Sequence, residues 1–503
     1  MTVIDGGDLD EEHAAGHVHG ICLKTGPPHR VGVELEWLVR DARDPALPVP
    51  AGRIAAAVTA FDAVRGDPGH GNGNGEDGDG PELPTSSRPG VLPSGALLTT
   101  EPGGQLELSS QPADSLADLV RATSADLVVL RAELATRGLE LAGIGLDPLR
   151  PPRRVLTLPR YAAMEAFFDA GGPWGRQMMC ATASVQVCLD AGDDSDGPSG
   201  YRRRWRLLHA IGPVLVGAFA NSPLRDGKPT GWVSSRQQVW ARMDPGRTRP
   251  PRMNGDPRAD WAAYALDAQV MCVPDPDSAD WSAPPGLTFR DWVRGATTAP
   301  VRRTGSPAAA RRAADGGATF RGAANGRVAV DTATPPGSAA GGWAAEDGPE
   351  GNGATGDGDG WLRRPTAGDL EYHLSTLFPP VRPRGHFELR MIDAQPADGW
   401  IVPLAVCTAL LSDAQAGDAA LAAVAPLWSG RWPGDDGPWA RGARFGPADP
   451  AISRASRACF AAAREALDRM SAPAAIKGAV DAFIDQYVNK DRCPADDLLE
   501  KTG

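Results

Sequence analysis

Residues 31–38, which read VGVELEWL, alternate between apolar and acidic side chains with the period of a β-strand. The apolar side chains of such a strand would face one way, while Glu34 and Glu36 would face the other. Same-face neighbours on a strand lie about 6.5–7 Å apart, so the two carboxylates are close enough to share bound cations. An isolated pair of this kind is more commonly a solvated polar face, and the strand by itself does not decide between the two.

Three further segments, residues 105–109, 182–189 and 387–392, alternate in the same way. Each puts apolar side chains on one face and, on the other, polar side chains that suit a binding site: Gln105, Glu107 and Ser109; Thr182, Ser184 and Gln186; Glu388 and Arg390. Such strands are typical of an antiparallel sheet that packs one side on helices and leaves the other side for a site. Glutamates from three separate stretches, with no lysine among them, indicate a site for hard cations.

A glycine pair and several helical patterns complete the expected architecture. Gly103 and Gly104 permit a tight turn, which would let Glu101 and Glu107 approach one site from either side. Helices are expected near residues 54–64, 116–134, 159–179 and 202–220. The pattern predicts an α+β fold whose C-terminal part, residues 400–503, is mostly helical, and 503 residues are enough for one large domain or a few smaller ones.

Two segments lack the large apolar residues that a packed core needs. Residues 66–84 are predicted to be a flexible polar loop, and residues 297–360, rich in Ala, Gly, Pro and Thr, a disordered insertion. Each contains a match to GxGxxG, but neither match follows a strand or opens a helix, so neither predicts a dinucleotide site. The chain has no GxxxxGKS or GxxxxGKT motif, so any nucleotide must bind through a different fold.

Composition narrows the class of protein. A formal net charge of −12 over 503 residues disfavours a nucleic-acid binder, which more often carries a basic surface. The seven cysteines are widely spaced and include no CxxC, which indicates free thiols in a reducing compartment. No signal-peptide pattern opens the chain and no apolar stretch is long enough to span a bilayer, so a cytoplasmic protein without membrane partners is expected.

Residues 228–248 concentrate arginines near two tryptophans. Two interpretations of Arg236, Arg242, Arg247 and the following Arg249 remain open at this point. They could form an exposed basic loop, or they could bind carboxylates and phosphates, for which planar guanidinium groups are well suited.

Seven stretches form an ordered series of motifs: VGVELEWL, EPGGQLELS, MMCATASVQVCLD, ANSPLRDGKPTGWVSSRQQVWARMDPGRT, YALD, HLSTLFPPVRPRGHFELR and PADDLLE. Together they resemble the motifs of the glutamate–cysteine ligases of the plant and proteobacterial kind, and most closely those of the actinobacterial enzymes that start ergothioneine synthesis. They span nearly the whole chain except the low-complexity segments. The insertion at residues 297–360 departs from the plant pattern, and the plant enzymes' regulatory cysteines have no convincing match, so redox control is not expected.

The resemblance implies a fold that shares its outline with glutamine synthetase, a curved antiparallel sheet with helices on its convex face. The concave face would bind ATP and two or three Mg²⁺ ions, which Mn²⁺ can replace. In the implied reaction ATP phosphorylates the γ-carboxylate of L-glutamate, and the amine of L-cysteine displaces phosphate from the γ-glutamyl phosphate. The product, γ-glutamylcysteine, would be the first intermediate of ergothioneine biosynthesis, and a monomer or weak dimer is expected.

Two alternatives stay open. A related carboxylate–amine ligase could use the same site with another amine acceptor, and the amine that stimulates ADP release would distinguish it. A non-catalytic glutamate or nucleotide sensor on this fold would not need the complete carboxylate cluster that this chain retains.

Carried over residue by residue, the family's motifs imply three sets of site residues. The metal ligands would be Glu34, Glu36, Glu101, Glu107, Glu388 and Gln186. Arg390 and Arg236 would be catalytic, with Arg390, Arg382 and His373 binding the ATP. The two amino-acid substrates would bind to Arg236, Thr182, Asn221, Ser235, Trp240 and Tyr264.

Overall fold

The computed structural model describes residues 9–61, 89–253, 255–275, 277–295, 363–428 and 437–502. The chain divides into two units, Met1–Ala296 with Arg364–Gly503, and Thr297–Arg363. Every described helix and strand belongs to the first unit. The segments predicted as a polar loop, residues 66–84, and as an insertion, residues 297–360, lie outside the described residues.

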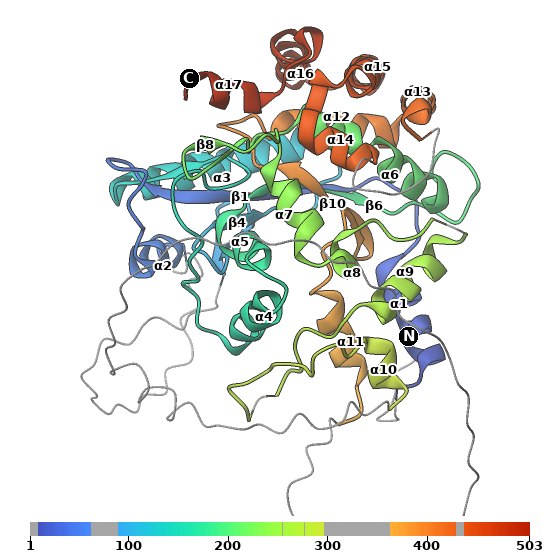
Figure 1. Ribbon diagram of the computed structural model, residues 1–503. Coiled ribbons are helices and arrows are strands. Elements are labelled where there is room, and N and C mark those ends of the chain that lie inside the picture. The colour runs from blue at the N-terminus through green and yellow to red at the C-terminus, as the bar shows by residue number, and fades with distance from the viewer. Residues whose placement is uncertain are drawn as a thin grey trace, which may run out of the picture. The chain divides into compact units, whose positions relative to one another are not determined.

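An eight-stranded antiparallel sheet forms the centre of the first unit within the described residues (Figure 1). Its strands follow the order β2 (Gly90–Val91), β3 (Leu97–Thr100), β4 (Leu106–Ser109), β1 (Val31–Asp41), β6 (Ser184–Asp190), β10 (His386–Asp393) and β9 (Val381–Pro383). The remaining strand, β5 (Leu139–Ala142), pairs with the second half of β1. The predicted α+β class with an antiparallel sheet is confirmed.

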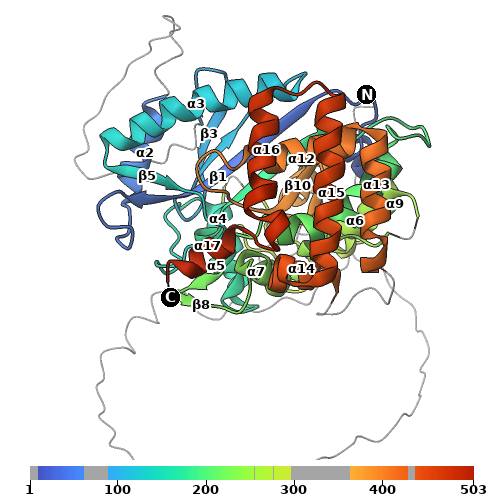
Figure 2. The same cartoon turned by 90° about the horizontal axis from the view of Figure 1, so that it is seen from above.

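Helices of the C-terminal part lie on one side of the sheet, together with two earlier helices (Figures 1 and 2). This group comprises α3 (Leu116–Thr136), α6 (Tyr201–Ala218), α12 (Ile401–Ser412), α13 (Ala414–Val424), α14 (Pro438–Phe445), α15 (Pro450–Arg469), α16 (Ala474–Gln486) and α17 (Pro494–Glu500). In Figure 2, seen from above, α12, α15 and α16 cross in front of the strands. Burial of ten of the twelve residues of α12 explains its almost wholly apolar sequence.

A second group of helices lies on the opposite side of the sheet in Figure 1. Its members are α1 (Glu11–Cys22), α4 (Pro159–Asp169), α5 (Trp174–Ala181), α7 (Ser235–Met243), α8 (Pro245–Thr248), α9 (Pro257–Asp267), α10 (Phe289–Val293) and α11 (Ala367–Leu374). Two smaller features complete the unit, namely α2 (Ala51–Thr59) and a hairpin of β7 (Leu224–Arg225) and β8 (Lys228–Pro229). None of the described helices combines the length and the hydropathy of a membrane span.

The apolar face of the sheet forms the core with the first group of helices. Val33 and Leu35 of β1 are 1% exposed, and Phe387 of β10 packs against Trp205 of α6 with ring centroids 5.5 Å apart. Full burial of a side chain of this size contributes about 1.5–3 kcal/mol to the free energy of folding. All seven cysteines are free thiols, as predicted.

The strand β10 contains a β-bulge. Leu389 pairs with Val187 and Ile392 pairs with Val185, so Arg390 and Met391 both lie opposite the one residue between these partners. Because the bulge adds one residue, the alternation of faces changes phase along β10. The sequence pattern alone predicts an even alternation to the end of the strand, and the bulge overturns it.

Candidate active site

The antiparallel register brings four of the predicted glutamates together at the centre of the sheet. On β1, Glu36 lies opposite Glu107 of β4, and Glu34 lies opposite Gln186 of β6. Glu388 is on β10, and only β6 separates β10 from β1. The alternation of side chains turns these carboxylates away from the apolar core.

A glycine turn between β3 and β4 brings Glu101 to the same face. Gly104 has a φ of 87°, and its N–H donates to Glu101 O at 2.8 Å. A Cβ on Gly103 would lie 2.2 Å from Cys180 O, so a larger residue cannot occupy this position. The glycine pair therefore permits both the left-handed turn and the close approach of two backbone segments.

Three of the glutamates have raised pKa values. Burial, followed by the charge of Glu388, raises the pKa of Glu34 to about 7. Burial and the charge of Glu36 raise the pKa of Glu101 to about 7. Burial and the neighbouring glutamates raise the pKa of Glu107 well above its ordinary value. These carboxylates repel one another, and a bound cation would reverse that effect.

Glu388 differs from the others because arginines neutralise it. Arg382 donates from Nε and Nη2 to its two oxygens at 2.9 and 2.8 Å, and Arg390 Nη1 also donates to it. Burial opposes ionisation, but Arg382 and Arg390 hold the pKa of Glu388 well below its ordinary value. Arg382, predicted to bind ATP, and Glu388, predicted to bind a metal, thus form a buried ion pair with each other.

Gln186 connects Glu36 to Arg390. Its Nε2 donates to Glu36 Oε1 at 2.8 Å, and its Oε1 accepts from Arg390 Nη1. Ser184 Oγ donates to the other oxygen of Glu36 at 2.8 Å. The amide oxygen of Gln186, predicted as a metal ligand, therefore already accepts a hydrogen bond from a cation.

The chemistry of this donor set fits a hard divalent cation. Carboxylate oxygens are the ligands that Mg²⁺ prefers, and buried carboxylates with raised pKa values gain most from such an ion. Among the described residues no three His, Cys, Asp or Glu side chains are arranged to enclose a single ion. The fit therefore rests on the charge and chemistry of Glu34, Glu101 and Glu107, whose pKa values burial and neighbouring glutamates raise in spite of nearby arginines.

Arg236, in the first turn of α7, lies beside Arg390 and is 1% exposed. Its Nη2 donates to Arg390 O at 2.8 Å and its Nη1 to Ile392 O at 3.5 Å, while the guanidinium stacks 4.5 Å from the ring of Trp240. In the described part of the chain its Nε is buried without a hydrogen-bond partner. Arg236 thus reaches the predicted site, but most of its donors hold the backbone of β10.

Three polar residues predicted to bind substrate form hydrogen bonds within the protein instead. Thr182 Oγ1 donates to a carbonyl of α5 at 2.7 Å, and Asn221 Nδ2 donates to two carbonyls at 2.8 Å each. Ser235 Oγ shares a hydrogen bond of 2.6 Å with Thr230. Each of the three predicted residues is at most 5% exposed, so their side chains position the segments around the site.

Tyr264 and His373 are not brought to the carboxylates. Tyr264 stacks on Trp261 of α9, with centroids 5.1 Å apart. His373 is 2% exposed, bonds Ala265 O at 2.8 Å, and has its pKa lowered to about 3 by burial. The structure places His373 in the core between α9 and α11, where the neutral imidazole packs like an aromatic ring, with its centroid 4.9 Å from that of Phe289.

Asp393 is a buried group that the sequence pattern missed. It accepts hydrogen bonds from Asn221 N at 2.9 Å, Ser222 Oγ at 2.6 Å and Ser234 Oγ at 3.0 Å. Burial raises its pKa, although these donors and Arg236 oppose the shift. An even alternation puts Asp393 on the apolar face, and only the bulge returns it to the face of the site.

Arg160 at the start of α4 is the second missed residue. Its guanidinium lies 5.9 and 5.3 Å from the rings of Tyr161 and Tyr372, and its charge lowers the pKa of Glu101 against the effect of burial. Its Nε is buried and has no hydrogen-bond partner within the described residues. A single arginine in a helical stretch gives no signal in the sequence that would have identified it.

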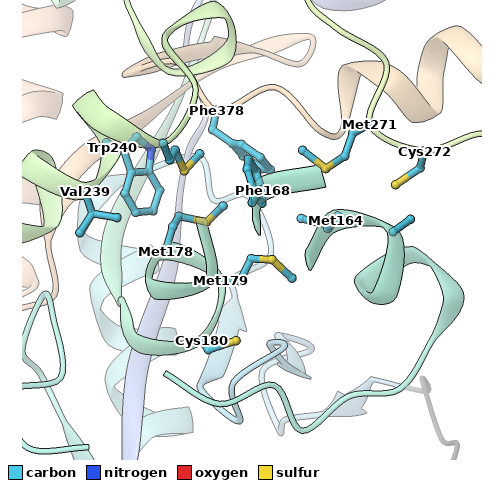
Figure 3. Close-up of a cluster of buried hydrophobic side chains, with 12 residues drawn as sticks. Met164, Phe168, Met178, Met179, Cys180, Val239, Trp240, Met271, Cys272 and Phe378 are labelled. Atoms are coloured by element: carbon cyan, nitrogen blue, oxygen red, sulfur yellow. The ribbon is translucent and has the colours of Figure 1, made fainter. Parts of the chain in front are cut away.

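A sulfur-rich apolar cluster lies beside these groups. Figure 3 shows side chains of α4, α5 and α7 gathered with those of two loops: Met164, Phe168, Met178, Met179, Cys180, Val239, Trp240, Met271, Cys272 and Phe378. Tyr161 and Tyr372, the two rings next to Arg160, pack against the edge of this cluster. Gln105 Nε2 connects the cluster to the glutamate turn by donating to Met179 O at 3.2 Å.

A family model and two relatives match nearly the whole chain, and all three are described as glutamate–cysteine ligases. The family model described as glutamate-cysteine ligase family 2 (GCS2) matches residues 30–503. The glutamate–cysteine ligase EgtA of Mycolicibacterium smegmatis is 35% identical over 97% of this chain and 91% of its own length. The protein of the same name from Mycobacterium tuberculosis strain H37Rv is 34% identical over 98% of this chain and 90% of its own.

More distant likenesses cover less or are weaker. The chloroplastic glutamate–cysteine ligase of Medicago truncatula is 35% identical over 30% of this chain and 29% of its own length. Among solved structures, a bifunctional glutathione synthetase from Pasteurella multocida aligns with 98% of this chain and 51% of its own, at 13% identity and a TM-score of 0.45. A likeness of that strength carries no argument about this chain.

Proposed function

The chain belongs to the glutamate–cysteine ligase family 2, and from that premise we propose that it joins the γ-carboxylate of L-glutamate to the amine of L-cysteine, using ATP. The products are γ-glutamylcysteine, ADP and phosphate, and the reaction is the first step of ergothioneine biosynthesis. The observation that carries the proposal is the likeness to ligases named EgtA over nearly the whole chain, including every strand that bears a site glutamate.

The reaction has two steps. The γ-phosphoryl group of ATP passes to the γ-carboxylate of glutamate, and the amine of cysteine then attacks the resulting acyl phosphate and releases phosphate. No GxSxG elbow or other recognisable nucleophile motif occurs near the four motif strands, so the activated acyl group stays on the bound substrate rather than on the protein.

We assign the metal-binding role to Glu34, Glu101 and Glu107 first, and to Glu36 with them. The raised pKa values of the first three support this assignment, because nearby arginines do not offset the effect of burial on them as Arg382 and Arg390 do for Glu388. Divalent cations bound there, two or three Mg²⁺ ions in our proposal, would neutralise the triphosphate oxygens during phosphoryl transfer.

We assign the phosphate-contacting role to Arg390. Burial lowers the pKa of Arg390, but the negative charges of Glu388, Glu36 and Glu34 outweigh burial and raise it. A guanidinium that is always charged and held by Glu388 and Gln186 can stabilise the phosphoryl oxygens without reorganising.

We assign the substrate amino acids to the space between the glutamates and the sulfur-rich cluster. Arg160 borders both and has a buried Nε without a partner among the described residues, which suits a substrate carboxylate. The polarisable side chains of Met179 and Trp240 in the adjoining cluster suit the thiol of cysteine. The orphaned Nε of Arg236 suits glutamate.

The finer architectural predictions belong to the same proposal. They are a sheet curved as in glutamine synthetase with helices on its convex face, one catalytic domain over residues 1–503, and a monomer or weak dimer in the cytoplasm. The antiparallel sheet supports the first of these, and the second group of helices, on the other side of the sheet, is an addition to it.

The test is an assay of ADP release by the full chain with Mg-ATP and a panel of amino-acid pairs. We expect release only when glutamate and cysteine are both present, with γ-glutamylcysteine formed in equal amount. If a different amine stimulated ADP release in the presence of glutamate, that amine and not cysteine would be the acceptor. ATP binding without any ADP release, for every pair, would indicate a sensor and refute the proposal.

A further inference from the structure

The bulge of β10 interrupts the regular hydrogen-bond ladder of the sheet. Opposite Gln186 the strand has two residues, Arg390 and Met391, where the ladder provides for one. The carbonyls of a buried strand must nevertheless be hydrogen-bonded, since a buried carbonyl without a partner destabilises the fold. Their partners therefore have to come from outside the sheet.

Side chains from the first turn of α7 supply these partners. Arg236 Nη2 donates to Arg390 O at 2.8 Å, and Gln237 Nε2 donates to Met391 O at 3.0 Å. These two residues come more than 150 positions earlier in the chain than the bulge, so nothing local connects them to it.

The start of α7 is itself fixed to the end of β10. Asp393 accepts from Ser222 Oγ and from Ser234 Oγ, and Ser234 in turn accepts from Gln237 N at 3.2 Å as the N-cap of α7. The first turn of α7 and the bulge therefore form one hydrogen-bonded unit.

The backbone of this unit sets the position of the Arg390 side chain. The guanidinium of Arg390 lies between Glu388 and Gln186, and its backbone carbonyl is bonded on the other side by Arg236. The next carbonyl along the strand, Met391 O, accepts a hydrogen bond from the side chain of Gln237. Among the described residues, no other side chain donates to it. A misplacement of a catalytic group by about 1 Å can reduce turnover by about 100-fold.

We propose that Gln237 is a positioning residue for the ligation, which acts by holding the β10 bulge so that Arg390 faces the phosphoryl group. This inference rests on the proposed function. Gln237 is the residue to test because it is only half-buried and touches no group assigned to substrate or metal, unlike Arg236.

The first test is Gln237→Glu, which keeps the size of the side chain but removes the donor to Met391 O. We expect kcat to fall about 10- to 100-fold while the KM values for glutamate and cysteine stay within about twofold. Gln237→Lys, which restores a donor, should recover part of the loss. Gln238→Glu is the matched control, since Gln238 is on the same helix but contacts Arg225 instead of β10.

The second test asks whether the effect passes through Arg390. In an Arg390→Lys background, Gln237→Glu should lower kcat by less than about twofold further, because the group that Gln237 positions is already changed. Fully additive losses, an equal loss in the Gln238→Glu control, unchanged kcat in Gln237→Glu, or a rise in KM alone would each overturn the proposal.

A third measurement is independent of ligase activity. Amide hydrogen exchange at residues 390–392 should accelerate in Gln237→Glu and stay unchanged in Gln238→Glu. If the wild-type chain released no ADP but this difference appeared, the proposed function would fail while the structural link between α7 and the bulge stood. If exchange were identical in both variants, the link itself would be refuted.

Discussion

Glu36 on β1 lies directly opposite Glu107 on β4, so one cross-strand pair of the central sheet consists of two carboxylates. Like charges in this position destabilise a sheet. Ser184 and Gln186 donate to Glu36 at 2.8 Å each, whereas Glu107 accepts only longer bonds, from Thr99 at 3.4 Å and Ser109 at 3.3 Å. The pair is therefore asymmetric, and Glu107 is the member that a cation would stabilise more.

This asymmetry predicts opposite effects on stability and activity for Glu107→Gln. Removing the repelled charge should raise the melting temperature of the metal-free protein by a few degrees. The same change should reduce turnover about 100-fold, because an anionic metal ligand is lost. Calorimetry and the ADP assay measure the two effects, with Glu140→Gln on the exposed side of β5 as control. A variant that lost stability and kept turnover would contradict the assignment.

Metal binding should be visible in thermal stability without any substrate. Mg²⁺ at about 100 times its dissociation constant should stabilise the wild-type fold by about 2.7 kcal/mol per site, and EDTA should reverse the gain. Glu36→Gln and Glu107→Gln should each reduce the stabilisation by Mg²⁺. As a control, monovalent salt alone, in a buffer without Ca²⁺, should not stabilise the protein in this way. Equal Mg²⁺ responses in wild type and both variants would place the ions elsewhere.

The buried ion pair between Arg382 and Glu388 should be structural as well as functional. Arg382→Met leaves Glu388 with Arg390 as its remaining close partner, so we expect a loss of about 3 kcal/mol in the free energy of unfolding, at the lower end for a broken buried pair. Arg384, which is 52% exposed and 3.9 Å from Glu388, is the control, and Arg384→Met should cost less than about 0.5 kcal/mol. Urea denaturation distinguishes the two, and equal losses would mean that burial is not the cause.

Stability should also depend on pH through the buried His209. Burial lowers the pKa of His209 from 6.5 to about 4 in the folded protein. Between these values the unfolded chain binds more protons than the folded one, so stability falls as the pH decreases from about 6.5 to 4, by up to about 1.4 kcal/mol per pH unit for this group. His209→Gln should reduce that slope, measured by urea denaturation across the window, and the exposed His13 provides a control variant. An unchanged slope would show that His209 is not the group responsible.

The amino-acid sequence by itself determined which side of β1 and β4 carries the carboxylates. Val33 and Leu35 are fully buried while Glu34 and Glu36 are half-buried, because a strand alternates with a fixed period of two and the hydrophobic effect selects the buried face. The sequence also predicted the tight turn at the glycine pair before β4. A φ of 87° at Gly104 and the close approach at Gly103 exclude most other residues. Both are local properties of a few consecutive residues.

The tertiary structure decided what the polar groups on that face contact. Arg382 and Arg236 both looked like ligand-binding cations, yet one neutralises Glu388 and the other bonds the bulge of β10. The bulge returned Asp393 to the site, and packing around α9 and α11 left His373 in the core. A guanidinium or imidazole can bond a ligand, a carboxylate or a backbone carbonyl equally well. Which one it meets depends on how the strands and helices pack. Arg236 and His373 meet backbone more than a hundred residues away, whereas the pairing of β9 with β10 brings Arg382 to Glu388.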